Sequence, residues 1–459
     1  DLIKNPEMEL EHISTPGSSY KYLAENLRLY LDGKNIEEVW WDVYQWYYSR
    51  PDWDKSRNAM LEALFYQNQP AAISPQMAGN LYKTPFRSSV SRLEQFVACP
   101  FAHFVRFGLK PQERKMYTVG APDIGILLHD CLASFASVVA ERKLNWRELQ
   151  RSECDAIVEE LMEQKLPLHN NGVLVSSFRY RYLGQRLKRL SRRAIWVLTE
   201  QIQKGNFEPL MHEVSFGTDG TFPPLQVELS NGQSIYLEGR IDRIDFLQEQ
   251  DTAYVKIIDY KTGERQLSLA DVYFGLSLQL FVYLAAVLNN QSDSGLVSRK
   301  PAGLFYFKVD DPLITSESKD LNRIEEQIRK ALKMKGLVLK DVQIARSMDS
   351  DLQQNSNILP AGIKQNGEFT AASSVLEEED FGALLGYVNK MLRTIGNEML
   401  QGKILIEPVK TEKTKACDYC IYHAICQFDK LFAANQYRNI PRLSDEQVLA
   451  RIRAQQEEI

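Results

Sequence analysis

The sequence predicts an α/β or α+β sandwich, in which β-strands lie between flanking helices. Three observations support this fold class. Apolar residues recur at helical spacing up to about residue 203, and β-rich runs separated by turn residues follow. A long apolar helix and a further strand come after those runs. The chain has 459 residues, of which 44% are hydrophobic and 25% charged, so it is long enough for more than one globular domain.

Residues up to about 85 are predicted to form the helical end of another unit. Within them, residues 35–51 place three tryptophans in one helical stretch that stops at Pro51. We interpret Trp40, Trp41 and Trp46 as aromatic core residues.

A second helix is predicted within residues 89–104. Ser91 followed by Glu94 matches a capping box, so we expect the helix to begin there and lead to Cys99. Two longer amphipathic helices are expected over residues 123–140 and about 180–203.

The β-rich runs are predicted to form a meander of antiparallel strands. They cover residues 213–216, 234–246 and 253–263, with the turn signals Asn-Gly and Gln-Glu-Gln-Asp between them. A helix over residues 276–288 and a strand over 302–309 follow. Residues 310–330 and 345–375 are polar, and we expect loops or insertions there.

Composition sets broad limits on function. The net charge of −5 argues mildly against a nucleic-acid partner, although local patches decide such binding. Neither an apolar run of membrane-spanning length nor a signal peptide is evident, so we expect a cytoplasmic protein whose six cysteines are thiols or metal ligands. The chain begins with Asp1 in the middle of a pattern, and we expect it to be part of something longer.

Carboxylates and a lysine gather on the predicted strands. Side chains alternate along a strand, so Asp259 and Lys261 share a face, whereas Asp242 and Asp245 point to opposite faces. The hairpin can bring one of these two beside Asp259. Two carboxylates with an adjacent lysine suit Mg2+ and the hydrolysis of a phosphodiester. The alternative is an ion pair at a strand end.

Four further residues are candidates for the same site. Gln279 and Tyr283 lie four apart on one face of the following helix, where they can hydrogen-bond a phosphate or a catalytic group. His129 lies on an upstream helix, and Glu213 stands at a strand start. Taken singly, residues of these types are more often structural than functional.

The order of these motifs resembles the RecB-type branch of the PD-(D/E)xK nucleases. The matching elements are G-x-x-x-H at 125–129, an acidic residue before a strand, G-R-I-D at 239–242, I-D-Y-K-T-G at 258–263 and Q-x-x-x-Y at 279–283. Within that branch, S-V-S-R-L-E-Q-F-V-A-C-P-F and the C-terminal C-x2-C-x5-C-Q-F resemble the AddB subunits of bacterial helicase–nucleases. The resemblance covers roughly residues 85–430 and implies a mixed central sheet flanked by helices.

The resemblance implies a role for each candidate. Asp242 and Asp259 would ligate Mg2+, and the carbonyl of Tyr260 and the side chain of His129 would help to hold it. Lys261 would position or polarise the attacking water. Gln279 and Tyr283 would support the site, and Glu213 would be a further acid. Gly-Arg-Ile-Asp stands where the family name has Pro-Asp.

Cys417, Cys420 and Cys426 form a C-x2-C-x5-C pattern that suits a metal site, but a tetrahedral sulfur site requires four ligands. The resemblance implies that Cys99 is the fourth and that the group is a [4Fe–4S] cluster, whereas spacing alone leaves Zn2+ open. Such a cluster would staple the two ends of the nuclease domain. Cys131 and Cys154 are not needed as ligands, and we expect them to be buried.

A basic helix is the predicted DNA contact. Residues 178–196 carry seven basic side chains and no acid, and Arg179, Arg186, Arg189 and Arg193 are the candidate DNA-binding residues. Tyr180 and Tyr182 could stack on bases of a single strand. The alternatives are a solvated face or a contact with an acidic partner.

The expected function is a Mg2+-dependent DNA nuclease of an AddAB-type complex that processes double-strand breaks for recombination. It would act on single strands from unwound duplex, for this subunit the 5′-terminated one, beside a motor subunit of the AddA type. The expected parts are a helical region over 1–85 belonging to a helicase-like unit, the nuclease domain over 86–435 and a helical tail over 436–459. No P-loop motif occurs in this chain. The rivals are a scaffold without catalysis and a standalone four-cysteine RecB-like nuclease.

Overall fold

The computed structural model describes residues 10–83, 85–112, 114, 118–290, 298–315 and 320–457. The chain forms two compact units. One unit comprises Asp1–Pro70 and His423–Gln436, and the other comprises Ala71–Tyr422 and Tyr437–Ile459. The predicted domain boundary at residue 85 stays a prediction, but residues 437–457 belong to the larger unit, where α17 packs against α15 and α11.

The smaller unit is helical and holds an aromatic core. Its elements are α2 (Pro16–Leu31), α3 (Val39–Tyr48), η1 (Pro51–Trp53), α4 (Asp54–Leu64) and α16 (His423–Cys426). Trp40 is fully buried among Leu23, Val43 and Tyr47, and Trp46 packs against this cluster. Trp41 is 40% exposed, so its assignment to the core was wrong.

The larger unit is built on a mixed six-stranded sheet with the strand order β2-β5-β6-β7-β8-β9. Its strands are β2 (Glu208–Phe216), β5 (Gly239–Glu249), β6 (Thr252–Lys261), β7 (Ser298–Lys308), β8 (Lys335–Leu339) and β9 (Val375–Leu376). Strands β2, β5 and β6 are antiparallel neighbours, whereas β6 and β7 run parallel. The predicted α/β sandwich with a mixed sheet is therefore confirmed.

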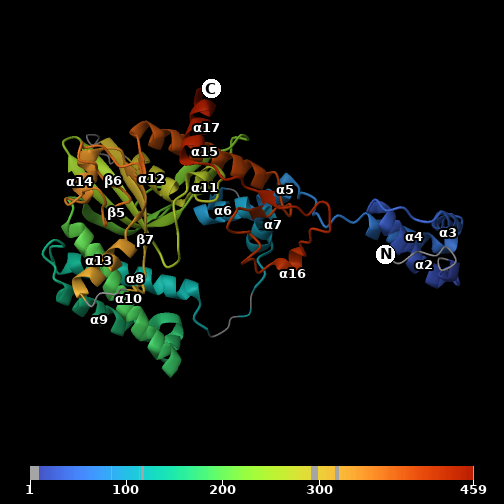
Figure 1. Cartoon of the computed structure of the whole chain (residues 1–459), viewed down its shortest axis with the longest axis horizontal. Coiled ribbons are helices and arrows are strands. Elements are labelled where there is room, and N and C mark those ends of the chain that lie inside the picture. The colour runs from blue at the N-terminus through green and yellow to red at the C-terminus, as the bar shows by residue number, and fades with distance from the viewer. Residues whose placement is uncertain are drawn as a thin grey trace. The chain divides into compact units, whose positions relative to one another are not determined.

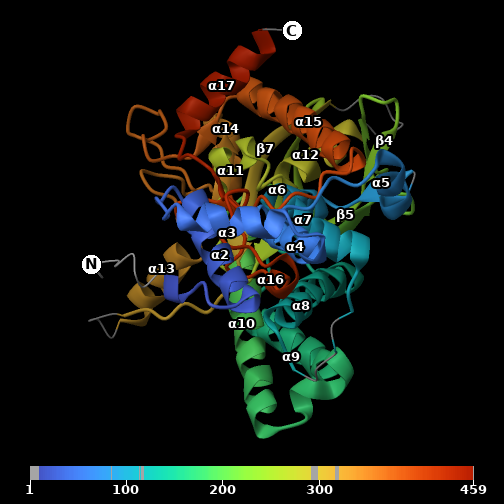
Figure 2. The same ribbon diagram turned by 90° about the vertical axis from the view of Figure 1, so that its right-hand side faces the viewer.

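Helices cover both faces of this sheet (Figures 1 and 2). On one side α8 (Ala121–Glu141), α9 (Arg151–Leu168) and α10 (Phe178–Gln203) pack on one another. On the other side α12 (Gln279–Asn289) packs on β6 and β7 and is covered by α15 (Glu378–Leu400). The remaining elements of the larger unit are α5 (Pro75–Tyr82), α6 (Val90–Ala98), α7 (Pro100–His103), η2 (Phe104–Leu109), η3 (His169–Val175), α11 (Leu269–Tyr273), α13 (Leu321–Ala331), α14 (Val342–Met348), α17 (Asp445–Glu457) and the paired strands β10 (Val409–Lys410) and β11 (Arg438–Asn439).

By length and composition alone, α8 could cross a membrane, so the expectation that no apolar run is long enough was wrong. One face of the helix, which includes Leu128, Cys131 and Phe135, is buried in the main hydrophobic core, whereas Ile126 is 62% exposed. Such burial is what the core helix of a globular domain requires.

One predicted strand is divided between two sheets. Residues 234–246 form β4 (Ser234–Leu237) and the start of β5, and the break falls at Glu238. Strand β4 joins a second sheet with β1 (Phe86–Ser88) and β3 (Leu225–Glu228), because it pairs with both of them. At the break, a Cβ on Gly239 would lie 2.8 Å from the Phe216 ring, so any other residue requires that ring to shift.

Two other local predictions were wrong. Helix α6 begins at Val90 with Ser89 as its N-cap, and Ser91 does not cap it. Residues 321–331 form the amphipathic helix α13, not a loop, because Ile328 reaches the core while arginines and glutamates cover the outer face.

Candidate functional site

Two carboxylates meet where β5 and β6 lie side by side. Arg243 pairs with Ile258 across this hairpin, which places the preceding Asp242 next to Asp259. The Oδ2 atom of Asp242 accepts a hydrogen bond from the Tyr260 N–H at 2.7 Å. Asp242 and Asp259 are 7% and 1% exposed. Of the two aspartates that the sequence offered on β5, it is Asp242 that joins Asp259.

Asp245 lies on the opposite face, in a buried trio with Arg243 and Lys256. Arg243 donates two hydrogen bonds to Asp245, at 2.6 and 2.8 Å, and the Lys256 ammonium lies 2.7 Å from the same carboxylate. Burial alone would raise the pKa of Asp245, but the two cations lower it to about 2. The trio is therefore a structural cluster of charges behind the site.

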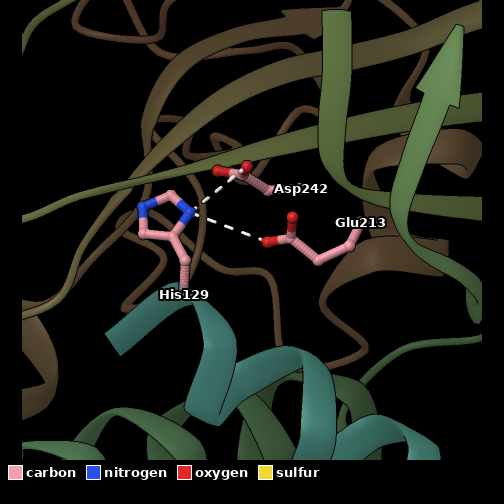
Figure 3. A group of neighbouring side chains, drawn as sticks. All are labelled: His129, Glu213 and Asp242. Atoms are coloured by element: carbon pink, nitrogen blue, oxygen red, sulfur yellow. Dashed lines mark ion pairs between the residues drawn. The ribbon is translucent and has the colours of Figure 1, made fainter. Parts of the chain in front are cut away.

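His129 and Glu213 complete a three-residue cluster with Asp242 (Figure 3). The residues come from α8, β2 and β5, and one possible ligand atom from each lies within 4.8 Å of the others. His129 Nδ1 is 3.3 Å from Asp242 Oδ1 and 3.8 Å from Glu213 Oε1. Glu213 has a φ of 50°, which is unusual for a non-glycine residue inside a strand.

Lys261 stands on the other side of Asp259, in contact with α12. Its Nζ lies 2.5 Å from Asp259 Oδ2 and donates a hydrogen bond to Gln279 Oε1 at 3.1 Å. The Gln279 Nε2 in turn donates to the Tyr283 hydroxyl at 2.6 Å. The structure thus brings the lysine, the glutamine and the tyrosine into one chain of contacts that starts at Asp259.

The electrostatics of the site are those of crowded carboxylates. Burial and the neighbouring charge of Asp242 raise the pKa of Asp259 to about 7, although Lys261 opposes this. Burial disfavours a charged His129, but hydrogen bonds and charges from Asp242 and Glu213 raise the pKa of His129 to about 10. A positive charge is therefore favoured between these carboxylates.

The donor set fits a hard divalent cation. Both Glu213 oxygens and Asp259 Oδ2 are buried, and their partners among the described residues are cationic side chains in ion-pair range. Three carboxylates and one imidazole supply the oxygen-rich ligands that Mg2+ prefers. Tyr260 contributes its N–H to Asp242 and its ring to an edge-on contact with His129, and its carbonyl as a ligand stays a prediction.

Two residues that contact the site were not predicted from the sequence. Arg240 Nε lies 2.6 Å from Glu213 Oε2, and its place two residues before Asp242 was the available signal. Glu94, read from sequence as the partner in a capping box of its own helix, accepts hydrogen bonds from Leu278 and Gln279 instead. That contact spans 184 residues for Leu278, so no local pattern reveals it.

Three of the predicted cluster cysteines belong to the larger unit. Cys99 is half-buried between α6 and α7, and burial together with the nearby Cys417 and Cys420 raises the pKa of Cys99 to about 11. Cys426 ends α16 in the smaller unit, where its carbonyl accepts a hydrogen bond from Asn68 at 3.1 Å. Cys131 and Cys154 are fully buried thiols, as expected.

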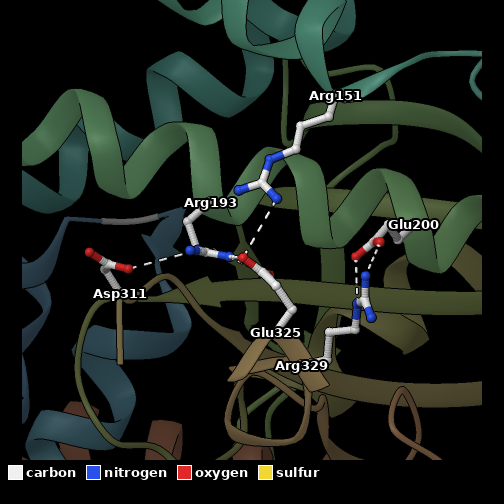
Figure 4. Close-up of polar contacts among 6 residues, drawn as sticks. All are labelled: Arg151, Arg193, Glu200, Asp311, Glu325 and Arg329. Carbon is white, nitrogen blue, oxygen red and sulfur yellow. Dashed lines mark hydrogen bonds and ion pairs between the residues drawn. The ribbon is translucent and has the colours of Figure 1, made fainter. Parts of the chain in front are cut away.

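On the basic helix, α10, two of the four predicted DNA-binding arginines form ion pairs with acids of their own unit, and Figure 4 shows those of Arg193. Arg193 lies 2.7 Å from Glu325 and 3.8 Å from Asp311, and Arg189 lies 2.7 Å from the same aspartate. Arg179 and Arg186 are exposed and form no ion pair with any residue in the described ranges. The role of these arginines in DNA binding stays a prediction.

The larger unit contains two adjoining cavities, each of about 740 Å³. They share the lining residues Ala98, Ala416 and Tyr419, so they meet there. The first is also lined by basic and aromatic residues and by cysteines: Arg106, Lys110, Phe107, Tyr422, Cys99 and Cys420. The second begins just after Lys261 and includes Glu264, Arg265, Asp271, Glu412, Lys413, Lys415 and Arg442.

Comparison with known proteins relates this architecture to nucleases. Residues 87–427 match the PD-(D/E)XK nuclease superfamily, and residues 5–63 match the fifth domain of the ATP-dependent helicase/deoxyribonuclease AddB. The chain is 48% identical over its full length to the B subunit of the ATP-dependent helicase/deoxyribonuclease of Alkaliphilus oremlandii. The corresponding B subunits from Alkaliphilus metalliredigens and Caldanaerobacter subterraneus are 47% and 40% identical over 99% and 95% of the chain.

The chain spans about 40% of the length of these relatives, covering 40%, 40% and 37% of them, and it matches their C-terminal part. The superfamily match covers the mixed sheet, the paired aspartates and Lys261. The chain therefore belongs to the PD-(D/E)XK nuclease superfamily, in the branch of the AddB-type helicase/deoxyribonuclease subunits.

Proposed function

We propose that this chain hydrolyses DNA in a Mg2+-dependent reaction, as the nuclease part of an AddAB-type helicase–nuclease. The observation that carries the proposal is the meeting of Asp242 and Asp259 with Lys261, whose Nζ lies 2.5 Å from Asp259 Oδ2. Carboxylates paired in this way need a cation, because their burial together is costly otherwise. The superfamily and the names of the relatives support the same reaction class.

His129, Glu213, Asp242 and Asp259 would hold the metal ion. Mg2+ in such a site lowers the pKa of a bound water and neutralises charge on a phosphodiester. Lys261 is held between Asp259 and Gln279, and its ammonium would position or polarise the attacking water. The Gln279 Nε2 donates to the Tyr283 hydroxyl, which keeps the amide oxygen available for Lys261.

We infer that the substrate is a single strand. The two adjoining cavities offer basic side chains for phosphates and the aromatic rings of Phe107, Tyr419 and Tyr422 for bases. Tyr419 is 93% exposed, so its ring is accessible for stacking on a base. The position of the second cavity, beginning at Glu264 and Arg265, leads a strand toward Lys261.

The same proposal includes a [4Fe–4S] cluster on Cys99, Cys417, Cys420 and Cys426. The thiols of Cys417 and Cys420 interact electrostatically with that of Cys99 in the larger unit, and this proximity supports a shared group there. A partner motor subunit of the AddA type and action on the 5′-terminated strand also belong to the proposal. They rest on the likeness to relatives that are named as B subunits of a helicase/deoxyribonuclease.

The decisive experiment is Mg2+-dependent cleavage of end-labelled single-stranded DNA by protein purified without air. Wild type should cleave, while Lys261→Ala and Asp259→Ala should not. Lys340→Ala is the matched control, because it removes an exposed lysine that pairs only with Glu377 among the ion pairs of the described residues. No cleavage by a wild type that keeps its iron and binds DNA would favour a scaffold function.

A second experiment addresses the single strand. Lys413→Ala with Lys415→Ala should weaken binding of an oligothymidylate by the inactive Asp259→Ala protein and reduce the salt dependence of that binding. Arg189→Ala with Arg193→Ala is the comparison pair, since these arginines already pair with acids. If only the Arg189 and Arg193 variant bound DNA more weakly, the DNA contact would lie on α10 and not in the cavities.

A further inference from the structure

Helix α12, which carries Gln279 and Tyr283, begins without a cap of its own. Its N-cap residue is Leu278, which has no side-chain acceptor. The first N–H groups of a helix need acceptors from elsewhere, because no helical carbonyl precedes them. Here the acceptor comes from α6: Glu94 Oε1 accepts the Leu278 N–H at 2.7 Å and the Gln279 N–H at 3.1 Å.

The loop before α12 supplies no substitute. The Ser277 hydroxyl lies 3.5 Å from the Tyr306 hydroxyl, away from the helix start. Glu94 therefore caps α12 from a distant part of the chain, and its negative charge also suits the positive end of the helix dipole.

The cap bears directly on the lysine. One of its two donors is the backbone N–H of Gln279, the residue whose side chain receives the Lys261 ammonium at 3.1 Å. The other end of that amide bonds to Tyr283, one turn further along α12. If the first turn of the helix frays, the Gln279 side chain and the lysine it holds both lose their position.

The environment of Glu94 agrees with a bonded, functional carboxylate. The side chain is half-buried on a helix that ends next to Cys99. Burial raises the pKa of Glu94, and the hydrogen bonds from Leu278 and Gln279 and the charges of Arg265 and Lys261 act against that. An acid so placed is costly unless its partners hold it.

We propose that Glu94 is a positioning residue for DNA cleavage, which caps α12 from α6 and thereby holds Gln279 against Lys261. The proposal rests on the nuclease function proposed above. It predicts that the acceptor atom matters more than the charge: glutamine keeps an Oε1 of the same reach, whereas alanine removes it and aspartate is one methylene too short.

The experiment compares Glu94→Ala, Glu94→Asp and Glu94→Gln in the iron-containing chain, at saturating Mg2+. We expect kcat to fall roughly 10- to 100-fold in the alanine and aspartate variants, since small misplacements of catalytic groups have effects of that size. The KM for DNA and the half-saturating Mg2+ concentration should stay within about threefold, because the carboxylates at the metal site are untouched. Glu94→Gln should recover most of kcat. Ser91→Ala is the matched control on α6, since its exposed hydroxyl contacts only the Ser89 hydroxyl among the hydrogen bonds of the described residues.

Two further measurements separate positioning from general damage. Hydrogen exchange of the peptide containing Leu278 and Gln279 should quicken about 5- to 10-fold in Glu94→Ala, the effect of one lost hydrogen bond, and return in Glu94→Gln. In a Gln279→Ala background, Glu94→Ala should add little further loss, because both act on the same amide.

Unchanged exchange in Glu94→Ala, or losses that multiply in the double variant, would overturn the proposal. If the wild type does not cleave DNA, the proposed nuclease function is wrong, and so is a role of Glu94 in catalysis. The hydrogen-exchange measurement would still test whether Glu94 caps α12. Should Glu94→Ala fail to fold, the contrast between aspartate and glutamine decides the same question.

Discussion

At Glu213 the backbone has a φ of 50° in the middle of β2, and the carboxylate lies in ion-pair range of His129 and Arg240. A left-handed conformation costs a residue with a side chain about 1–3 kcal/mol. Strain of this kind persists where the surrounding structure requires it, and at Glu213 it turns a strand side chain toward His129 and Asp242. This is why Glu213, the least distinctive acid in the sequence, belongs with the metal-site candidates.

Replacing Glu213 should therefore separate stability from activity. Glu213→Gly should raise the free energy of unfolding by about 1 kcal/mol, because glycine adopts a positive φ without strain. The same variant should need more Mg2+ for half-maximal cleavage, since one carboxylate is lost. Denaturant unfolding and a Mg2+ titration of cleavage measure the two effects. Glu213→Gln, which keeps the strain, should weaken the Mg2+ response without the gain in stability.

His103 predicts a dependence of stability on pH that is independent of the metal site. It is fully buried among Tyr82, Phe96 and Phe107, and its Nε2 accepts a hydrogen bond from Arg92 at 3.3 Å. Burial, with the charge of Arg92, lowers the pKa of His103 to about 3.

The unfolded chain binds a proton at this residue below about pH 6.5, while the folded chain does not until about pH 3. The free energy of unfolding should therefore fall as the pH drops through that range, by up to about 1.4 kcal/mol per pH unit. Urea unfolding at several pH values measures the slope. His103→Phe should flatten it, and an unchanged slope in that variant would assign the acid sensitivity to other groups.

At the scale of elements, the start of β5 packs closely against Phe216 because residue 239 is a glycine. A Cβ on Gly239 would lie 2.8 Å from the Phe216 ring, and three residues later the strand presents Asp242. Gly239→Ala should destabilise the larger unit by about 1–3 kcal/mol, the usual effect of overpacking, and should reduce cleavage as β5 shifts. Gly263→Ala is the matched control, because its Cβ would meet no atom within 4 Å. Equal stability of the two variants would show that Phe216 can move aside.

The elements also show how far the sequence could be interpreted. Helices and strands with strong periodicity, such as α8, α10 and β6, were predicted close to their observed bounds. The division of residues 234–246 between two sheets was missed, because β4 is paired with β1, which lies some 150 residues earlier in the chain. The amphipathic α13 was missed for a different reason: its charged outer face masks the few apolar residues that reach the core.

The candidate site, like the fold, could be predicted only in part from local patterns in the sequence. Alternation along one strand predicted that Asp259 and Lys261 share a face, and the contacts of Lys261 with Asp259 and Gln279 agree with it. The choice between Asp242 and Asp245 needed the pairing across the hairpin. The acids that form ion pairs with Arg189 and Arg193 lie more than 100 residues later in the chain, so no pattern within α10 could predict these contacts.

At the scale of the whole molecule, the cysteines connect distant parts of the sequence. Cys99 and Cys420 line one cavity although 320 residues separate them in the numbering, about the span that a crosslink would close. Cys420→Ser should lose iron and destabilise the chain, by up to about 5 kcal/mol on the loop-closure estimate. Iron analysis, visible absorption and thermal unfolding measure this. Cys131→Ser is the control, because it changes a buried thiol outside the proposed ligand set and should keep its iron. A stable, fully active Cys420→Ser protein without iron would contradict the proposed structural role of the cluster.

The buried trio of Arg243, Asp245 and Lys256 has a consequence for how the site is assembled. Moving β5 by one residue against β6 would turn every side chain of β5 to the other face, and Asp242 would exchange places with its neighbours. In that slipped register Asp245 would leave both cations, and an uncompensated buried charge costs about 3–5 kcal/mol. The ion pairs of the trio therefore stabilise one register of β5 against β6. That register also places Asp242 beside Asp259, so charges on one face of the sheet determine which side chains meet on the other face.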